Sequence, residues 1–151
     1  MESVVNENFY TNYKNKKVFV TGHTGFKGSW LITWLTMLGA QVKGYALAPQ
    51  NEKDIYNTVS KHITIESVLA DKKEKKRLKE EMLAFEPDFI FHLAAQPLVR
   101  YGYKNPIETF EVNTMGTAHL LEAVRSLTKK CTVVLITTDK VYKNIEQDYA
   151  Y

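Results

Sequence analysis

The sequence has a single cysteine, Cys131, so an intramolecular disulfide framework is excluded. Its polar start, residues 1–17, contains no apolar run that could serve as a signal peptide, and no segment approaches the roughly 20 apolar residues that a membrane helix requires. Charged residues make up 25% of the chain and the formal net charge is only +3, which is neither a nucleic-acid-binding balance nor an acidic disordered tail. These absences predict a soluble, cytoplasmic protein that binds neither nucleic acid nor membrane.

The length of the chain, 151 residues, is that of one domain. Residues 1–16 are polar and without an apolar period, and we expect them to form a flexible lead-in. From residue 17 onward short apolar runs alternate with longer stretches of helical period, which is typical of a parallel sheet covered on both faces. The fold class predicted for residues 17–151 is therefore α/β, a doubly wound sheet of the Rossmann type. The expected elements are 18–20, 28–38, 42–47, 63–69, 73–85, 89–93, 106–127 and 133–137.

Two of the expected helices have local signals of their own. At the start of 106–127, Pro106 suits the first helical position, where no amide donor is missed, and Asn105 before it would supply an N-cap oxygen. The charged run 71–81 predicts the solvated face of the crossover helix that precedes the strand 89–93.

A glycine-rich turn follows the first expected strand. Residues 17–28 read KVFVTGHTGFKG and lead directly into a helical stretch. In dinucleotide-binding folds the first glycine allows a tight turn, the second lets the backbone approach a pyrophosphate, and the third lets the helix pack close to the sheet. The helix then faces the phosphates with its unpaired amides and positive dipole end. The cofactor-binding residues predicted here are Gly22, Thr24, Gly25, Phe26 and Gly28.

Several motifs together resemble one family. The sequence TGHTGFKGSW resembles the opening of the extended short-chain dehydrogenases of the NAD-dependent epimerase/dehydratase type, in particular the CDP-glucose 4,6-dehydratase branch. HLAAQPLVR at 92–100, Asn113 with Gly116-Thr117, and TTDKVY at 137–142 follow in the family's order. The resemblance implies the strand order 3-2-1-4-5-6, with this chain truncated after the fifth strand, and it implies a bound NAD.

The same resemblance implies an activity for the full-length parent. It is that of a lyase in polysaccharide biosynthesis that converts CDP-glucose to CDP-4-keto-6-deoxyglucose: NAD oxidises the sugar at C4, water is eliminated across C5 and C6, and hydride returns to C6. Thr138 would bind the sugar hydroxyl, Asp139 would be the acid and Lys140 the base, where many relatives have Asp-Glu. A lysine can act as a base only if burial or a neighbouring cation lowers its pKa.

The remaining site residues lie at the ends of other strands. Ala94 and Ala95 have almost no side chain, which would let the backbone lie against a cofactor at the carboxyl edge of the sheet. Beyond them the resemblance suggests that Gln96 and Arg100 face the sugar nucleotide, although a surface salt bridge is an alternative for the arginine. Asp71 matches the position where relatives hold the adenine amino group, and it could equally be a helix N-cap.

The second expected strand lacks the carboxylate that commonly holds the ribose of NAD, and residues 47–49 read Leu-Ala-Pro. Glu52 and Asp54 follow a few residues later and could reach the ribose, but a surface role is favoured for each. No arginine stands there for a 2′-phosphate, which favours NAD over NADP. His92 is expected to be buried and hydrogen-bonded, and no histidines have ligand spacing, so no metal site is expected.

Two further function classes stay open. The family's catalytic Tyr-x-x-x-Lys pair is absent after residue 142, so the chain alone is expected to be inactive and could be a non-catalytic dinucleotide-binding module or fragment. It could also belong to another NAD-dependent sugar-nucleotide epimerase or dehydratase. The fifth strand, CTVVLIT at 131–137, would present an apolar edge without proline or charge, which predicts a homodimer or other self-association.

Overall fold

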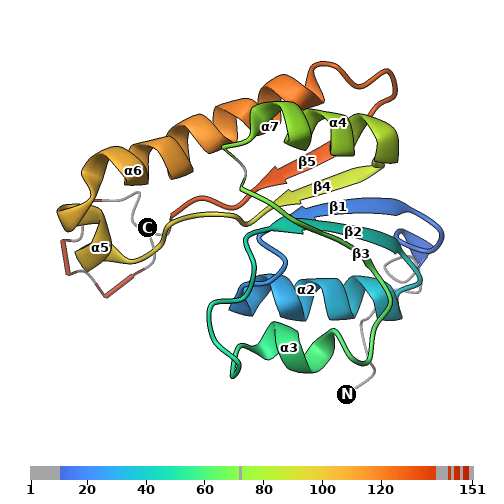
Figure 1. Ribbon diagram of the computed structural model, residues 1–151, viewed down its shortest axis with the longest axis horizontal. Helices are drawn as coiled ribbons and strands as arrows, with labels where there is room; N and C mark the ends of the chain where they lie inside the picture. Colours follow the sequence, from blue (N-terminus) through green and yellow to red (C-terminus); the bar gives the residue numbers. More distant parts are fainter. Residues whose placement is uncertain (1–10, 72, 139–142, 144, 147, 150–151) are drawn as a thin grey trace.

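The computed structural model describes residues 11–71, 73–138, 143, 145–146 and 148–149. Five parallel strands form one sheet in the order β3-β2-β1-β4-β5, with helices on both faces (Figure 1). The predicted Rossmann-type α/β fold and the order of its first five strands are therefore confirmed. The strands are β1 (Lys17–Thr21), β2 (Gln41–Ala46), β3 (Glu66–Leu69), β4 (Phe89–His92) and β5 (Thr132–Leu135).

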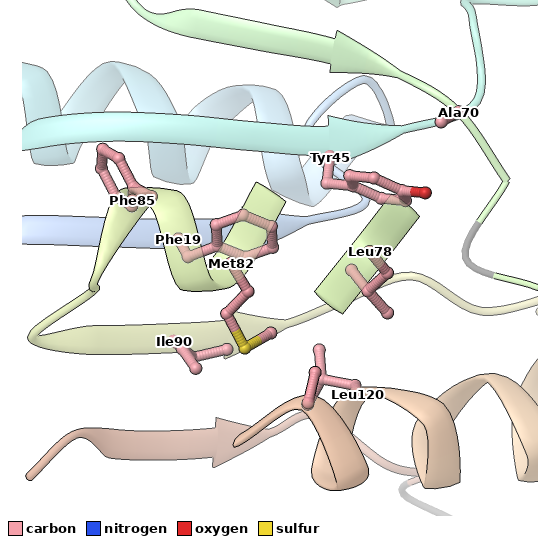
Figure 2. Packing of buried hydrophobic residues seen from close by; sticks show 9 residues of the cluster. Phe19, Tyr45, Ala70, Leu78, Met82, Phe85, Ile90 and Leu120 are labelled. Carbon is pink, nitrogen blue, oxygen red and sulfur yellow. The ribbon is translucent and has the colours of Figure 1, made fainter. Parts of the chain in front are cut away.

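The two helical layers bury opposite faces of the sheet (Figure 1). On one face lie α2 (Phe26–Met37) and α3 (Ile55–Val59), and on the other α4 (Lys75–Phe85) and α7 (Gly116–Val124). Because side chains alternate along a strand, Val18 and Val20 of β1 pack with the α2 cluster while Phe19 between them packs with Leu78 and Leu120 of α4 and α7 (Figure 2). The central strand is thus buried on both sides, as a parallel sheet requires.

The charged run before β4 lies on α4, as predicted. Leu78, Met82 and Phe85 of this helix are buried, while the charged residues 73–77 before them are exposed. The spacing of three and four residues places the apolar side chains on one face of the helix.

The long helix expected over 106–127 is divided. It consists of α6 (Pro106–Phe110), the π turn η1 (Glu111–Met115) and α7, and it is preceded by the short α5 (Val99–Lys104). Pro106 occupies the first position of α6, as predicted. The prediction for Asn105 was wrong: its side chain makes no cap hydrogen bond, and its amide nitrogen donates to the Tyr101 carbonyl at 3.4 Å.

Residues 11–16, at the end of the expected lead-in, lie against the sheet. The Tyr13 ring packs on Phe89 with the ring centroids 5.1 Å apart, and the Asn15 amide donates to the Gly39 carbonyl. Within the described ranges, no helix has the length and apolar character needed to span a bilayer.

Candidate functional site

A cleft of about 620 Å³ opens at the carboxyl edge of the sheet. It lies at the end of β1, between β2 and β4. The helical connections on the β2 side and on the β4 side of β1 run over opposite faces of the sheet (Figure 1). Such a switch point is where open α/β sheets bind ligands, and the volume is within the usual range for small-molecule sites. Its walls are formed by the glycine turn after β1 and by the segments 45–51, 53–55, 70–71 and 93–95. Lys73 before α4, Glu108 of α6 and Val112 of the π turn complete the lining.

Two glycines of the turn are required by the packing of the backbone. Gly22 has φ +77°, and a Cβ there would lie 2.8 Å from the Ala94 nitrogen. A Cβ on Gly28 would collide with the Gly22 carbonyl oxygen. Gly22 lines the cleft and Gly28 does not, so Gly28 acts by bringing α2 close to the sheet.

Gly25 is different, because the fold has room for a side chain there. Its φ is −75°, and the atom closest to an added Cβ, the Gly22 carbonyl oxygen, is at the ordinary contact distance of 3.4 Å. Gly25 is the N-cap residue of α2 and lines the cleft, and the first turn of that helix carries no acidic residue. The missing side chain therefore leaves space on the ligand side, at a helix end suited to an anion. This cradle fits the pyrophosphate of a dinucleotide.

The neighbouring turn residues complete this wall. The Thr24 hydroxyl donates to the Leu47 carbonyl at 2.9 Å, joining the turn to the segment after β2. Phe26 lines the cleft with its side chain 71% exposed.

A chain of hydrogen bonds fixes the floor of the cleft at Ala94. The Ala94 amide donates to Thr21 Oγ1 (3.3 Å), which is 2.6 Å from His92 Nδ1, while His92 Nε2 is 3.0 Å from Thr117 Oγ1. Thr117 uses its proton on the Asn113 carbonyl (2.7 Å), so it accepts from His92 Nε2–H, and Nδ1 accepts from Thr21. His92 is buried, and each of its ring nitrogens has a hydrogen-bond partner. The expectation of a buried, hydrogen-bonded residue is confirmed.

Gln96 is tied to the π turn rather than exposed to the cleft. Its amide donates to Asn113 Oδ1 (2.8 Å), and Asn113 Nδ2 donates back to its carbonyl (3.0 Å). Its side chain bonds Thr109 and the Leu98 amide. Arg100 is exposed on α5 and is in none of the ion pairs formed by the described residues. Neither predicted substrate residue lines the cleft.

The opposite wall is built around Tyr45, which sequence reasoning missed. Its hydroxyl donates to the Asp71 carbonyl at 3.0 Å. Figure 2 shows the Tyr45 ring at the edge of the core, and burial there raises the pKa of Tyr45 to about 12. The Asp71 carboxylate accepts from the Lys73 amide (2.9 Å) and lies 3.4 Å from its Nζ. Since α4 begins at Lys75 with Glu74 as its N-cap, the N-cap alternative for Asp71 was wrong. Asp71 lines the cleft.

The segment after β2 is held by Asp54. Its Oδ2 accepts from the amides of Gln50 (2.9 Å) and Asn51 (3.1 Å), just before α3, and Asp54 lines the cleft whereas Glu52 does not. Other lining residues that sequence reasoning missed are Lys53, Lys73, Glu108 and Val112. Only their proximity to predicted strand ends or to the resemblance motifs could have indicated them.

His23 points away from the cleft. Its ring is fully buried between β2 and α3, with Nε2 2.8 Å from Ser67 Oγ and the Tyr56 ring edge-on at 5.2 Å. Gly44 makes this possible, because a Cβ there would occupy the position of the ring. Burial lowers the pKa of His23 to about 4.

The predicted catalytic segment follows β5. Thr138 is exposed and does not line the cleft, and Asp139 and Lys140 lie outside the described residues. In the part of the chain that the structure describes, no three His, Cys, Asp or Glu side chains gather as a metal site would need.

The site therefore combines a glycine cradle, a helix N-terminus and a floor of small residues. Over residues 19–149 the chain matches the family described as GDP-mannose 4,6 dehydratase. The chain belongs to this family. It is 46% identical to a CDP-glucose 4,6-dehydratase of Salmonella typhimurium, over 98% of this chain and 40% of the relative, and 33% identical to a CDP-paratose 2-epimerase of Salmonella typhi, over 89% and 40%. The chain thus spans about 40% of the length of these relatives.

Solved structures agree with this assignment. A Stenotrophomonas maltophila UDP-glucose-4-epimerase with bound NAD and formylated UDP-arabinopyranose superposes with a TM-score of 0.77 at 25% identity, over 89% of this chain and 40% of that one. A Thermus thermophilus UDP-glucose 4-epimerase in complex with NAD gives 0.62 at 28% identity, over 72% and 33%. The resemblance noted in the sequence is confirmed. Of the predicted cofactor residues, the cleft brings together Gly22, Thr24, Gly25, Phe26, Asp71, Ala94 and Ala95.

Proposed function

We propose that this chain is the cofactor-binding part of an NAD-dependent sugar-nucleotide 4,6-dehydratase, a lyase that acts on CDP-glucose in polysaccharide synthesis in the cytoplasm. The observation that carries the proposal is the cradle at Gly25, in a dehydratase-family chain that is 46% identical to a CDP-glucose 4,6-dehydratase. NAD in the cleft would supply the acceptor and donor of the hydride.

Each wall of the cleft has a part in this proposal. The backbone at Gly25 and the first amides of α2 bind the pyrophosphate. Ala94, held by the Thr21–His92 chain, gives a flat floor against which a flat ring can lie. Asp71 stays the proposed contact of the adenine amino group, and the buried Tyr45 closes the wall behind it.

The elimination itself would depend on residues that follow β5. This strand runs parallel to β4, so its carboxyl end lies at the same edge of the sheet as Ala94. We propose that Thr138 binds a sugar hydroxyl, that Asp139 gives a proton to the departing hydroxyl, and that Lys140 removes the C5 proton. Gln96, held by Asn113, would place the segment up to Arg100 beside the sugar nucleotide.

Replacement of Gly25 by valine tests the cofactor site. The fold tolerates a Cβ there, so Gly25→Val should keep its melting temperature but lose NAD affinity by about a hundredfold or more, because the side chain fills the pyrophosphate position. Calorimetric titration with NAD measures this. Gly102→Val, in α5 and away from the cleft, is the matched control. Unchanged NAD affinity in Gly25→Val would show that the cradle is not the cofactor site.

The chemistry is tested in a longer protein that contains this chain and is active. There Lys140→Met should slow formation of the 4-keto-6-deoxy product by about 10²- to 10⁴-fold, the range of a lost general base, while transient cofactor reduction remains visible by absorbance. Lys143→Met, outside the TTDK motif, should behave like the unaltered protein. A normal rate of product formation in Lys140→Met would exclude Lys140 as the base. If the unaltered protein instead formed an epimerised sugar without loss of water, the alternative function, that of an epimerase, would be identified.

A further inference from the structure

The side chain of His23 leaves the glycine turn on the side away from the cleft. Gly22 and Thr24, on either side of it in the chain, line the cleft, whereas His23 does not and its ring is fully buried. The ring passes over β2 and reaches β3, where Nε2 is 2.8 Å from Ser67 Oγ. The turn that would receive a pyrophosphate is therefore attached, through a buried side chain, to a strand that it does not adjoin.

Gly44 of β2 provides the space that the ring occupies. A Cβ on Gly44 would collide with Cγ, Cδ2 and Nδ1 of His23. The φ of Gly44 is not in the positive region, so the conformation of the strand does not itself require a glycine. A glycine inside a strand often marks the close approach of another group, and here that group is the His23 ring.

Two hydroxyl groups hold the far side of the ring. The Tyr56 hydroxyl, on α3, donates to Ser67 Oγ at 2.9 Å, and the Tyr56 ring meets the His23 ring edge-on with the centroids 5.2 Å apart. Ser67 is thus a shared point of attachment for the glycine turn and for α3. An alanine in its place would leave both partners without this hydroxyl.

The other attachments of the turn are to the end of β2. The Gly22 amide donates to the Tyr45 carbonyl and the Thr24 hydroxyl donates to the Leu47 carbonyl, each at 2.9 Å. These bonds hold the turn beside β2, whereas His23 holds it from the side opposite the cleft. A turn that is already ordered pays less conformational entropy when a ligand binds, so each attachment made before binding favours affinity.

We infer that His23 is a positioning residue for the cofactor: its buried ring, held by Ser67 and Tyr56, preorganises the glycine turn so that the backbone at Gly25 can receive a pyrophosphate. The inference rests on the proposed cofactor function. None of these three side chains lines the cleft, so they act on the ligand only through the turn. Affinity for the cofactor is thereby coupled to the packing of β3 and α3 behind the site.

Calorimetric titration of Ser67 variants with NAD, well below each melting temperature, tests the inference. Ser67→Ala should weaken NAD binding by about three- to thirtyfold, because the ring loses its partner and the turn becomes less ordered. Ser67→Thr keeps the hydroxyl and should bind within about threefold of the unaltered chain. Ser126→Ala, which removes an exposed hydroxyl away from the cleft, is the matched control and should bind NAD normally.

Gly44→Ala tests the ring without altering the turn. The added methyl group displaces the ring, so the melting temperature and the NAD affinity should both fall. His23→Ala in the same chain removes the collision, so the melting temperature should recover while the NAD affinity stays low. Recovery of both would assign His23 a packing role alone and overturn the inference. Gly102→Ala, where the atoms nearest to an added Cβ are at least 3.5 Å away, is the control.

Hydrogen exchange of the ligand-free chain observes the turn directly. In Ser67→Ala the amides of Gly22 and Gly25, which donate to the Tyr45 and Gly22 carbonyls, should exchange faster than in the unaltered chain. Unchanged exchange and unchanged NAD affinity in Ser67→Ala would overturn the inference and leave the proposed function intact. If the unaltered chain does not bind NAD, the proposed cofactor function fails and this inference fails with it.

Discussion

Two histidines, His23 in the glycine turn and His92 at the end of β4, are buried, and each has a different set of contacts. His92 pairs with Thr21 through Nδ1 and with Thr117 through Nε2, so both of its ring nitrogens have partners. His23 is buried between β2 and α3, with Nε2 2.8 Å from Ser67 Oγ. Burial disfavours the charged imidazole there and lowers the pKa of His23 to about 4, from an ordinary value near 6.5.

This depressed pKa predicts acid sensitivity. Between about pH 6.5 and pH 4 the unfolded chain binds a proton that the folded chain refuses, so stability is fully present above pH 6.5 and is lost as the pH falls. The loss from His23 should reach roughly 2 kcal/mol between about pH 7 and about pH 5. Urea unfolding at the two pH values measures it.

A histidine-to-glutamine pair provides the control. His23→Gln keeps a hydrogen-bonding group for Ser67 but cannot ionise, so its stability should change less over this range. The exposed His62→Gln should retain the full pH dependence. Equal pH dependence in His23→Gln and the unaltered chain would show that another group titrates.

At the scale of elements, the π turn η1 positions the backbone at Gln96. A π turn adds one residue to the helix and changes the direction of the side chains within it, and such turns are frequent at functional sites. Here it places Asn113 against the backbone of Gln96, where one side chain satisfies both an amide and a carbonyl. The carbonyl of Asn113 also receives the Thr117 hydroxyl, which joins the turn to the His92 chain.

Removal of this side chain should destabilise the chain. Asn113→Ala leaves the amide and carbonyl of Gln96 without their partner, at a cost of about 1–3 kcal/mol in the free energy of unfolding. Asn105→Ala removes only a long 3.4 Å bond and should change stability by less than about 0.5 kcal/mol. Urea denaturation of both variants makes the comparison, and equal effects would mean that the contact with Gln96 is not the source of the loss.

The same elements explain what the sequence could predict. The strands β1, β2 and β4 and the helices α2, α4 and α7 bury side chains, and burial leaves a periodic pattern that can be seen in the residues themselves. By contrast, α3 and α5 contain no buried residue, so they have no apolar period and were missed. The glycine cradle was predictable because its constraints are local.

Contacts between distant segments were not predictable in this way. The pair Gln96–Asn113 and the bond between Tyr45 and Asp71 join residues from different elements, and no local pattern indicates either. Asn105 had the right residue type for an N-cap, but its φ of −130° and ψ of 64° direct the chain so that its side chain bonds backward to Tyr101 instead.

At the scale of the whole molecule, the sheet has an apolar edge at β5. In the described residues this strand pairs only with β4, and Val134 and Ile136 are each 41% exposed. Thr132 and Ile136 direct their amides to β4, so alternation directs the amides of Val133 and Leu135 outward. The arm formed by α5 and α6 beyond the sheet (Figure 1) adds further exposed apolar side chains, Tyr103, Ile107 and Phe110.

An edge of this kind favours strand addition, so we expect the chain to self-associate through β5. Light scattering across a concentration series should show growth in mass. Hydrogen exchange locates the contact: protection of the outward amides of Val133 and Leu135 should rise with concentration, while that of Val134 and Ile136, which face β4, should stay constant. Val134→Lys places a charge on the edge and should reduce association, whereas Thr58→Lys on the exposed side of α3 should not. A monomer at high concentration whose Val133 and Leu135 amides exchange freely would mean that the β5 edge is not an association surface.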